Sequence, residues 1–182
     1  MDHKYLGTCF DRQVRIDLWN QDKLKEQTVL ILGVGGLGSV VLMNVLRLGV
    51  KKVIIVDYDV VDVHNLNRQI MYGLEDVGKP KVESALKNCK HHNVGGSEVE
   101  GYHLDAVKNW SKIIEFAKES NVVFNCIDYG DKYDIAVSSL CMALKLPLIM
   151  GGTFATMFTV DYIHFEGRAC FLCMGDEGKI NK

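Results

Sequence analysis

The chain has 182 residues, 48% of them hydrophobic and 24% charged, and its formal net charge is -2. This length and composition are typical of one globular domain with a substantial core. The charge provides no basic surface for DNA or an anionic membrane, and no apolar stretch approaches the roughly 18 residues that span a bilayer. The six cysteines are too scattered for a secreted disulfide framework, so we expect a cytoplasmic protein, with the nucleus as the alternative location.

The first part of the chain differs in pattern from the rest. Residues 1–10 are irregular, and the spacing of the apolar residues that follow predicts a helix over 12–26 that lies across one face of a sheet. We therefore expect residues 1–27 to form an arm and a helix packed on a core, and residues 28–182 to form that core.

A glycine-rich turn follows the first strongly apolar segment. Residues 29–32 are all β-branched or leucine, which predicts a buried parallel strand. Gly33, Gly35 and Gly38 then fit the G-x-G-x-x-G spacing, and Gly36 adds another glycine. The first glycine permits the turn, the second lets the backbone approach a phosphate, and the third lets the next helix pack closely on the sheet. The turn therefore predicts a phosphate site at the start of a helix.

Strands and helices alternate along the remaining sequence. Apolar runs and turn residues predict strands over 28–32, 52–57, 98–102, 122–127 and 148–150. The intervening patterns predict helices that end near 49, 89, 119 and 144. Residues 157–165 alternate in polarity and predict an antiparallel addition after Gly151 and Gly152 close the last parallel strand. The fold class is α/β, a Rossmann-like, doubly wound and mostly parallel sheet with an antiparallel C-terminal extension.

Polar residues gather where the strands of this sheet would end. Asp57 follows Gly38 by roughly 20 residues, the spacing of a ribose-hydroxyl acceptor. The loop after it carries Arg68, and Lys81 lies at the start of the next helix. These cations favour a triphosphate over a dinucleotide because a triphosphate carries more negative charge. Asp128 ends the fourth strand and is suited to Mg²⁺ bound to phosphates.

The motifs together resemble those of the superfamily that activates ubiquitin-like proteins. This superfamily includes bacterial sulfur-carrier adenylyltransferases and the eukaryotic activating enzymes of ubiquitin-like modifiers. The resemblance covers essentially the whole chain, and the combination is more specific than any single motif. The motifs are Phe10-Asp-Arg-Gln-Val-Arg15, Gly33-Val-Gly-Gly-Leu-Gly-Ser39, Asp57-Tyr-Asp59, Asn65-Leu-Asn-Arg-Gln69, Gly78-Lys-Pro-Lys81 and Cys126-Ile-Asp128.

The resemblance implies a role for each matching position. It implies that the glycine turn and Asp57 hold the adenosine of ATP, and that Arg68 and Lys81 act catalytically on its phosphates. It implies that Asp128 is catalytic through Mg²⁺, and that Arg12 reaches the site of a partner subunit in a homodimer or heterodimer. The complete nucleotide-binding set implied is Gly33, Gly35, Gly36, Gly38, Asp57, Asp59, Asn65, Arg68, Gln69, Lys81 and Asp128.

The implied reaction is ATP-dependent adenylation of a ubiquitin-like, β-grasp carrier protein. The carrier's C-terminal glycine carboxylate attacks the α-phosphate and yields an acyl-adenylate and pyrophosphate. This chemistry needs positioning and charge neutralisation but no protein nucleophile. The sequence agrees, since it offers cations and a magnesium carboxylate without a Ser-His-Asp constellation.

The chain departs from the family in two places. Cys170 and Cys173 form one C-x-x-C, which is half of a Cys₄ zinc site. The family's second pair lies further along, so we expect a domain truncated before it, with Zn²⁺ bound only in a full-length protein and no support for a thioester step. Tyr129 also replaces the family's usual asparagine after the magnesium aspartate.

Other functions compete with this interpretation. An NAD-linked oxidoreductase has the same glycine turn, although residues 65–69 and 78–81 argue against it. A tRNA-modifying member of the superfamily is a second alternative, and the acidic balance opposes it. A third is a catalytically incomplete partner subunit of a heterodimeric activating enzyme.

Overall fold

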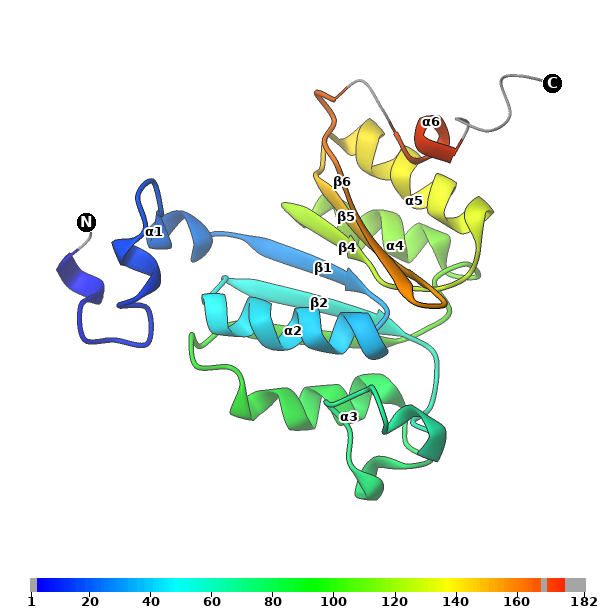
Figure 1. The fold of residues 1–182 in the computed structure, drawn as a ribbon, viewed down its shortest axis with the longest axis horizontal. Coiled ribbons are helices and arrows are strands. Elements are labelled where there is room, and N and C mark those ends of the chain that lie inside the picture. The colour runs from blue at the N-terminus through cyan, green and yellow to red at the C-terminus, as the bar shows by residue number, and fades with distance from the viewer. Residues whose placement is uncertain (1–2, 168–169, 176–182) are drawn as a thin grey trace.

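A computed structural model describes residues 3–167 and 170–175 and shows a six-stranded sheet in the order β3-β2-β1-β4-β5-β6 (Figure 1). The strands are β1 (Thr28–Leu32), β2 (Lys52–Asp57), β3 (Glu98–His103), β4 (Val122–Asn125), β5 (Leu148–Phe154) and β6 (Met157–Ile163). The pairs from β3 to β5 are parallel, and β6 is antiparallel to β5. The predicted fold class is confirmed. The strand order reverses between β1 and β4, and this is where ligands bind in such sheets.

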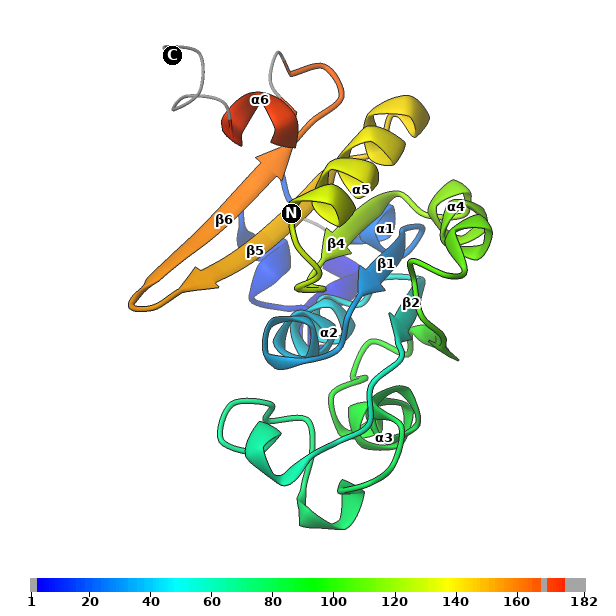
Figure 2. The ribbon, with the colours of Figure 1, turned by 90° about the vertical axis from the view of Figure 1, so that its right-hand side faces the viewer.

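Helices cover both faces of the sheet, as Figure 2 shows. They are α2 (Gly36–Leu48) and α3 (Lys81–Asn88) on one face, and α4 (Trp110–Lys118) and α5 (Asp131–Leu144) on the other. Alternate residues of each central strand point to opposite faces of the sheet. In β1, Ile31 packs in the hydrophobic cluster under α2, and Leu30 packs in the cluster under α5. β1 is buried at every position, and burial on both faces explains why it is apolar from Val29 onward.

Two glycines set the ends of α2. Gly33 turns the chain out of β1 with a φ of 85°, a conformation that favours glycine. At the other end Gly49 adopts a left-handed C-cap with φ 75°, and its N–H donates to the Leu46 carbonyl. The predicted end of this helix near residue 49 is therefore confirmed.

The predicted helix over 12–26 is wrong. The arm instead contains η1 (His3–Tyr5), η2 (Gln13–Arg15) and the short helix α1 (Gln21–Leu24). Leu18 breaks the helical path because its φ is 67°. The Asn20 side chain then caps α1 by accepting from the Lys23 N–H.

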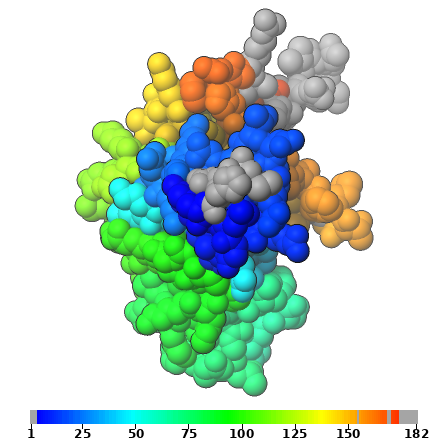
Figure 3. All heavy atoms as spheres, turned by 90° about the vertical axis from the view of Figure 1, so that its left-hand side faces the viewer, coloured from blue at the N-terminus to red at the C-terminus, as the bar shows by residue number. Residues whose placement is uncertain are grey.

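The arm packs on the end of α2 rather than across a sheet face. Phe10 belongs to a small separate cluster with Tyr5 and Val14. Its ring occupies the place of the side chain that Gly49 lacks, since a Cβ there would lie 2.5 Å from the ring. Gln21 is buried and donates to the Leu48 carbonyl at 2.8 Å. Figure 3 shows the arm on the face away from the carboxyl ends of the strands.

The fifth strand is longer than predicted. β5 continues through Gly151 and Gly152 because β6 pairs with it along its whole length. The antiparallel addition itself is confirmed, and the hairpin projects from the body of the molecule (Figures 2 and 3). The short turns η3 (Val63–Asn65), η4 (Leu74–Asp76) and η5 (Cys89–His91) and the helix α6 (Phe171–Gly175) complete the described chain.

Within the described ranges, no helix is long and apolar enough to cross a membrane. The division into an arm and a core at residue 27 stays a prediction, and the end of the predicted core at 182 lies outside the described residues.

The close packing of α2 on β1 gives a stability prediction. A Cβ at Gly38 would lie 1.8 Å from the Gly33 carbonyl oxygen, whereas one at Gly36 would meet only the Arg68 side chain at 3.8 Å. We expect Gly38→Ala to lower the free energy of unfolding by about 3 kcal/mol, since the helix has to move off the strand. Urea denaturation measures the loss. Gly36→Ala is the matched control, and equal stability of the two variants would contradict the packing argument.

Candidate nucleotide-binding site

A cavity of about 610 Å³ opens over the carboxyl ends of β1, β2 and β4. It brings together most of the predicted nucleotide-binding residues: Gly33, Gly35, Gly36, Asp57, Asp59, Asn65, Arg68, Gln69, Lys81 and Asp128. Gly38 does not line it and instead allows the contact between α2 and the turn. The free N–H groups at the start of α2 lie at the cavity, which suits an anionic group.

Asp57 fixes the glycine turn from the end of β2. Its Oδ2 accepts from the Val34 N–H at 2.9 Å, and its Oδ1 accepts from the Asp59 N–H at 2.8 Å. Burial raises the pKa of Asp57, although the two backbone N–H groups and the charge of Lys81 oppose this shift. Each oxygen keeps a second lone pair, so the carboxylate remains able to accept from a ribose hydroxyl.

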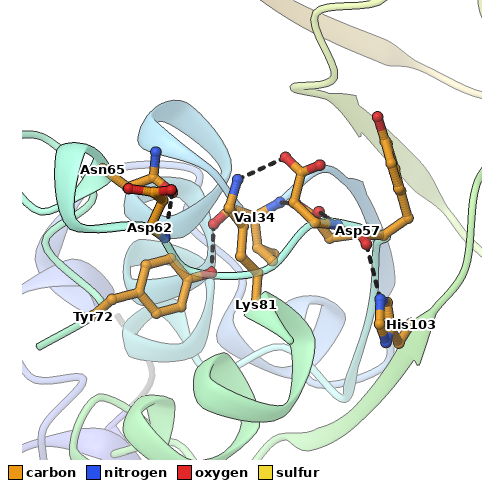
Figure 4. Close-up of polar contacts among 9 residues, drawn as sticks. Val34, Asp57, Asp62, Asn65, Tyr72, Lys81 and His103 are labelled. Carbon is orange, nitrogen blue, oxygen red and sulfur yellow. Dashed lines mark hydrogen bonds and ion pairs between the residues drawn. The ribbon is translucent and has the colours of Figure 1, made fainter. Parts of the chain in front are cut away.

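Tyr72 holds the other side of the same peptide segment. Its hydroxyl donates to the Val34 carbonyl at 2.7 Å, and both groups are buried (Figure 4). Burial raises the pKa of Tyr72 far above its usual value, so the hydroxyl stays protonated as a donor. Val34 is thus held at its N–H by Asp57 and at its carbonyl by Tyr72. Sequence reasoning missed Tyr72, because a tyrosine at the end of a polar loop carries no local signal for this contact.

Lys81 lies inside the site rather than on its rim. Only 5% of the residue is exposed, and its Nζ lies 2.8 Å from Asp59 Oδ2. The helix α3 begins at Lys81, after Pro80 has ended the preceding turn. Lys79, two residues before it in the same motif, is exposed and donates to the Glu75 carbonyl instead. Lys79 therefore contributes no charge to the cavity lining.

The loop after β2 supplies the second cation. Asn65 is buried and its Oδ1 accepts from the Asp62 N–H at 3.1 Å, which closes the turn η3. Arg68 lies on the exposed side of this loop, where its Nη1 donates to the His64 carbonyl and to Asn67 Oδ1, each at 3.0 Å. Both partners are uncharged, so the guanidinium keeps its full charge for an anion in the cavity.

Gln69 presents an unsatisfied group close to the glycine turn. The residue is 4% exposed, and its Oε1 has no hydrogen-bond partner. Its Nε2 lies 3.6 Å from the position of a Cβ on Gly35. An unpaired buried amide oxygen costs about 1–3 kcal/mol, and a bound ligand with a donor group removes that cost.

The acidic end of the cavity is formed by the segment after β4. Asp128 is exposed and lines the cavity, which fits one carboxylate ligand of a phosphate-bound Mg²⁺. Tyr129 is 55% exposed and packs edge-on against Tyr133, so an aromatic wall stands at the position where the resemblance implies an asparagine. Burial raises the pKa of the Cys126 thiol to about 12, which makes this cysteine a poor nucleophile.

Two groups of predicted residues lie outside the cavity. Arg12 is exposed and does not line the cavity. It belongs to the arm, which Figure 1 shows at the end of the sheet away from the arrowheads of β1 and β2. Cys170 and Cys173 lie at α6 with their Sγ atoms 3.4 Å apart. A hydrogen bond from the backbone N–H of Cys173 lowers the pKa of Cys170. In the described part of the chain no cluster of three or more potential metal ligands includes them, so their zinc role stays a prediction.

Fold and site together define an α/β protein with a cavity, lined by a glycine turn and two cations, at the point where the strand order reverses. The chain belongs to the ThiF family, which matches residues 10–182. This agrees with the resemblance to the superfamily that activates ubiquitin-like proteins.

Curated relatives are adenylyltransferases and activating-enzyme subunits. "Adenylyltransferase and sulfurtransferase MOCS3-1" of Zea mays is 32% identical over 155 residues, covering 85% of this chain and 32% of the relative. "SUMO-activating enzyme subunit 2" of Dictyostelium discoideum is 30% identical over 152 residues, covering 84% of this chain and 22% of the relative. The chain therefore spans about a third or less of the length of these two proteins.

A solved structure with a similar fold contains ATP. The crystal structure of E. coli MccB with ATP superposes with a TM-score of 0.76 at 25% sequence identity, and the match covers 86% of this chain and 46% of MccB.

Val34 is held by hydrogen bonds with two side chains, and removing the one with Tyr72 should have a measurable effect. Tyr72→Phe leaves the buried Val34 carbonyl without a partner, so we expect the free energy of unfolding to fall by about 1–3 kcal/mol. We also expect weaker ATP binding, because the glycine turn loses its preorganisation. Urea denaturation and calorimetry measure the two effects. Tyr162→Phe, at a tyrosine that is 63% exposed, serves as the control. Unchanged stability of Tyr72→Phe would show that the hydrogen bond does not hold the turn.

Proposed function

We propose that this chain is an ATP-dependent adenylyltransferase that activates the C-terminal carboxylate of a ubiquitin-like or sulfur-carrier protein. One observation carries the proposal: a single cavity combines the start of α2, the cations Arg68 and Lys81, and the exposed carboxylate of Asp128. This set suits a triphosphate better than a dinucleotide. The relatives named above support the same reaction class.

The proposed reaction transfers an adenylyl group between two bound anions. A carboxylate oxygen of the carrier forms a bond to the α-phosphorus of ATP, and the bond from that phosphorus to the bridging oxygen of pyrophosphate breaks. The products are an acyl-adenylate and pyrophosphate. The residues of this chain act by holding the anions in line and offsetting their charge.

We assign parts of this task to particular residues, and the contacts described above support the assignment. Asp57 and the N–H groups after Gly33 position the ribose and phosphates, and Arg68 and Lys81 offset the phosphate charge. Asp128 would hold Mg²⁺, which supplies further charge neutralisation on the phosphates when it is bound. Arg12 acts on a nucleotide only if a second chain brings it to the site, so its predicted role rests on a dimer.

Loss of a single charge contact tests the assignment of the site. We expect Arg68→Ala and Asp128→Ala each to lower the rate of ATP–pyrophosphate exchange with a β-grasp carrier by at least ~100-fold, the cost of one preorganised transition-state contact. Lys79→Ala and Asp131→Ala remove the same charges outside the cavity and serve as controls. Full activity of both site variants would refute the assignment.

Nucleotide preference separates this function from the dehydrogenase alternative. We expect calorimetry to detect binding of Mg-ATP but of neither NAD⁺ nor NADH, and we expect Arg68→Ala to weaken ATP binding. NAD binding without ATP binding would reverse the proposal. Binding of neither nucleotide would favour an incomplete partner subunit.

A further inference from the structure

A second cleft continues from the acidic end of the nucleotide cavity. It has a volume of about 290 Å³ and lies between the carboxyl ends of β4 and β5, the strand β6 and the helix α5. The two spaces share Asp128 and Thr153 in their linings. The glycines that extend β5 leave room here, because a Cβ on Gly151 would lie 3.1 Å from the Leu37 side chain. A molecule that reacts beside Asp128 therefore has a continuous path into this cleft.

The cleft carries negative charge without a matching cation. Asp128, Asp134 and Asp161 line it, and its lining contains no lysine, arginine or histidine. Among the residues that the structure describes, no ion pair engages any of the three. Burial raises the pKa of Asp134, and the nearby charges of Asp131 and Asp128 raise it further.

An unsatisfied side-chain amide in the cleft is a second, independent observation that points to a ligand. Asn125 lines the cleft and is 2% exposed. Its Nδ2 donates to Asp134 Oδ1 at 2.7 Å, but its Oδ1 is buried and accepts no hydrogen bond. A buried acceptor of this kind carries an uncompensated desolvation cost, which a donor from a ligand would offset. A positively charged group that donates hydrogen bonds would therefore satisfy both the amide and the carboxylates.

The spacing of the acidic groups distinguishes an organic cation from a metal ion. Within the described residues, no three carboxylate, histidine or cysteine side chains lie close enough together to hold a metal. A guanidinium or ammonium group on a flexible stem can donate several hydrogen bonds to separated acceptors. We infer that this cleft binds the side chain of an arginine or lysine that precedes the reacting carboxylate of the acceptor protein.

This inference rests on the proposed function and refines its substrate class. The acceptor has to bring a carboxylate to Asp128 past two further aspartates, and a basic side chain close to its C-terminus offsets that repulsion. The cleft therefore favours acceptors with a basic C-terminal segment and disfavours those with an acidic one.

Peptide binding tests the inference without requiring adenylation. Fluorescent peptides ending in Gly-Gly would carry a single arginine, alanine or glutamate at each of the preceding positions in turn. Anisotropy measures their affinity for the full chain in the presence of Mg-ATP. We expect arginine at one position to bind at least ~10-fold tighter than alanine, and glutamate to bind more weakly than alanine.

Matched variants locate the preference in the cleft. We expect Asp161→Asn and Asp134→Asn each to reduce the arginine preference to less than ~3-fold, whereas Asp131→Asn, an exposed position on the same helix outside the cleft, retains it. Asp161→Lys should reverse the preference toward glutamate. Equal binding of all peptides to the unmodified chain, or no binding of any, would overturn the inference.

The experiment tests the binding of a basic side chain in the cleft separately from the proposed adenylyltransferase activity. Calorimetry with Mg-ATP on the same preparations reports on nucleotide binding. Loss of ATP binding with a retained arginine preference would reject only the adenylyltransferase. ATP binding without a peptide preference would reject only the cleft assignment.

Discussion

The contact between Gly38 and the Gly33 carbonyl oxygen sets the geometry of the whole site. The two segments lie so close that the smallest side chain would overlap at 1.8 Å. This approach places the start of α2 directly beyond β1, where Asp57 and Tyr72 can hold the intervening Val34 from two sides. The N–H groups at the helix start then face the cavity without partners from the helix itself. The phosphate site that we propose is thus a consequence of packing between a strand and a helix.

The charges of the site are arranged with opposite signs at its two ends. Arg68 and Lys81 lie beside the glycine turn, and the uncompensated carboxylates lie beyond Asp128. An adenylation reaction joins two negatively charged partners, so each has to be received by different surroundings. The cationic end suits phosphates directly. The acidic end suits a carboxylate-bearing chain only if that chain supplies positive charge of its own.

The sequence predicted the parts of this structure that depend on local patterns. The apolar run at 29–32, the glycines after it and the acid that ends β2 follow one another at fixed spacing, so β1, the turn and the place of Asp57 could be predicted. Lys81 was predicted as a cation, but its burial against Asp59 depends on how α3 packs. The lining shared by Asn125, Asp134 and Asp161 comes from three separate elements and has no signature in the sequence.

Two errors have the same physical origin. The helix over 12–26 was inferred from apolar spacing, but the left-handed backbone of Leu18 ends that path and the arm folds against Gly49 instead. The strand β5 was expected to stop at Gly151, yet pairing with β6 carries it onward. In both cases a contact with a distant segment overrode the local preference, and such contacts cannot be read from neighbouring residues.

The ion pair of Lys81 and Asp59 has a consequence for selectivity among anions. Lys81 is buried, whereas the Asp59 side chain is 48% exposed, so an incoming anion competes with this carboxylate for the lysine charge. Chloride or a lone carboxylate offers a single charge and exchanges one ion pair for another with little net gain. A chain of phosphates contacts several groups at once and can complete the exchange. The pair therefore favours a polyanion over a single small anion at this site.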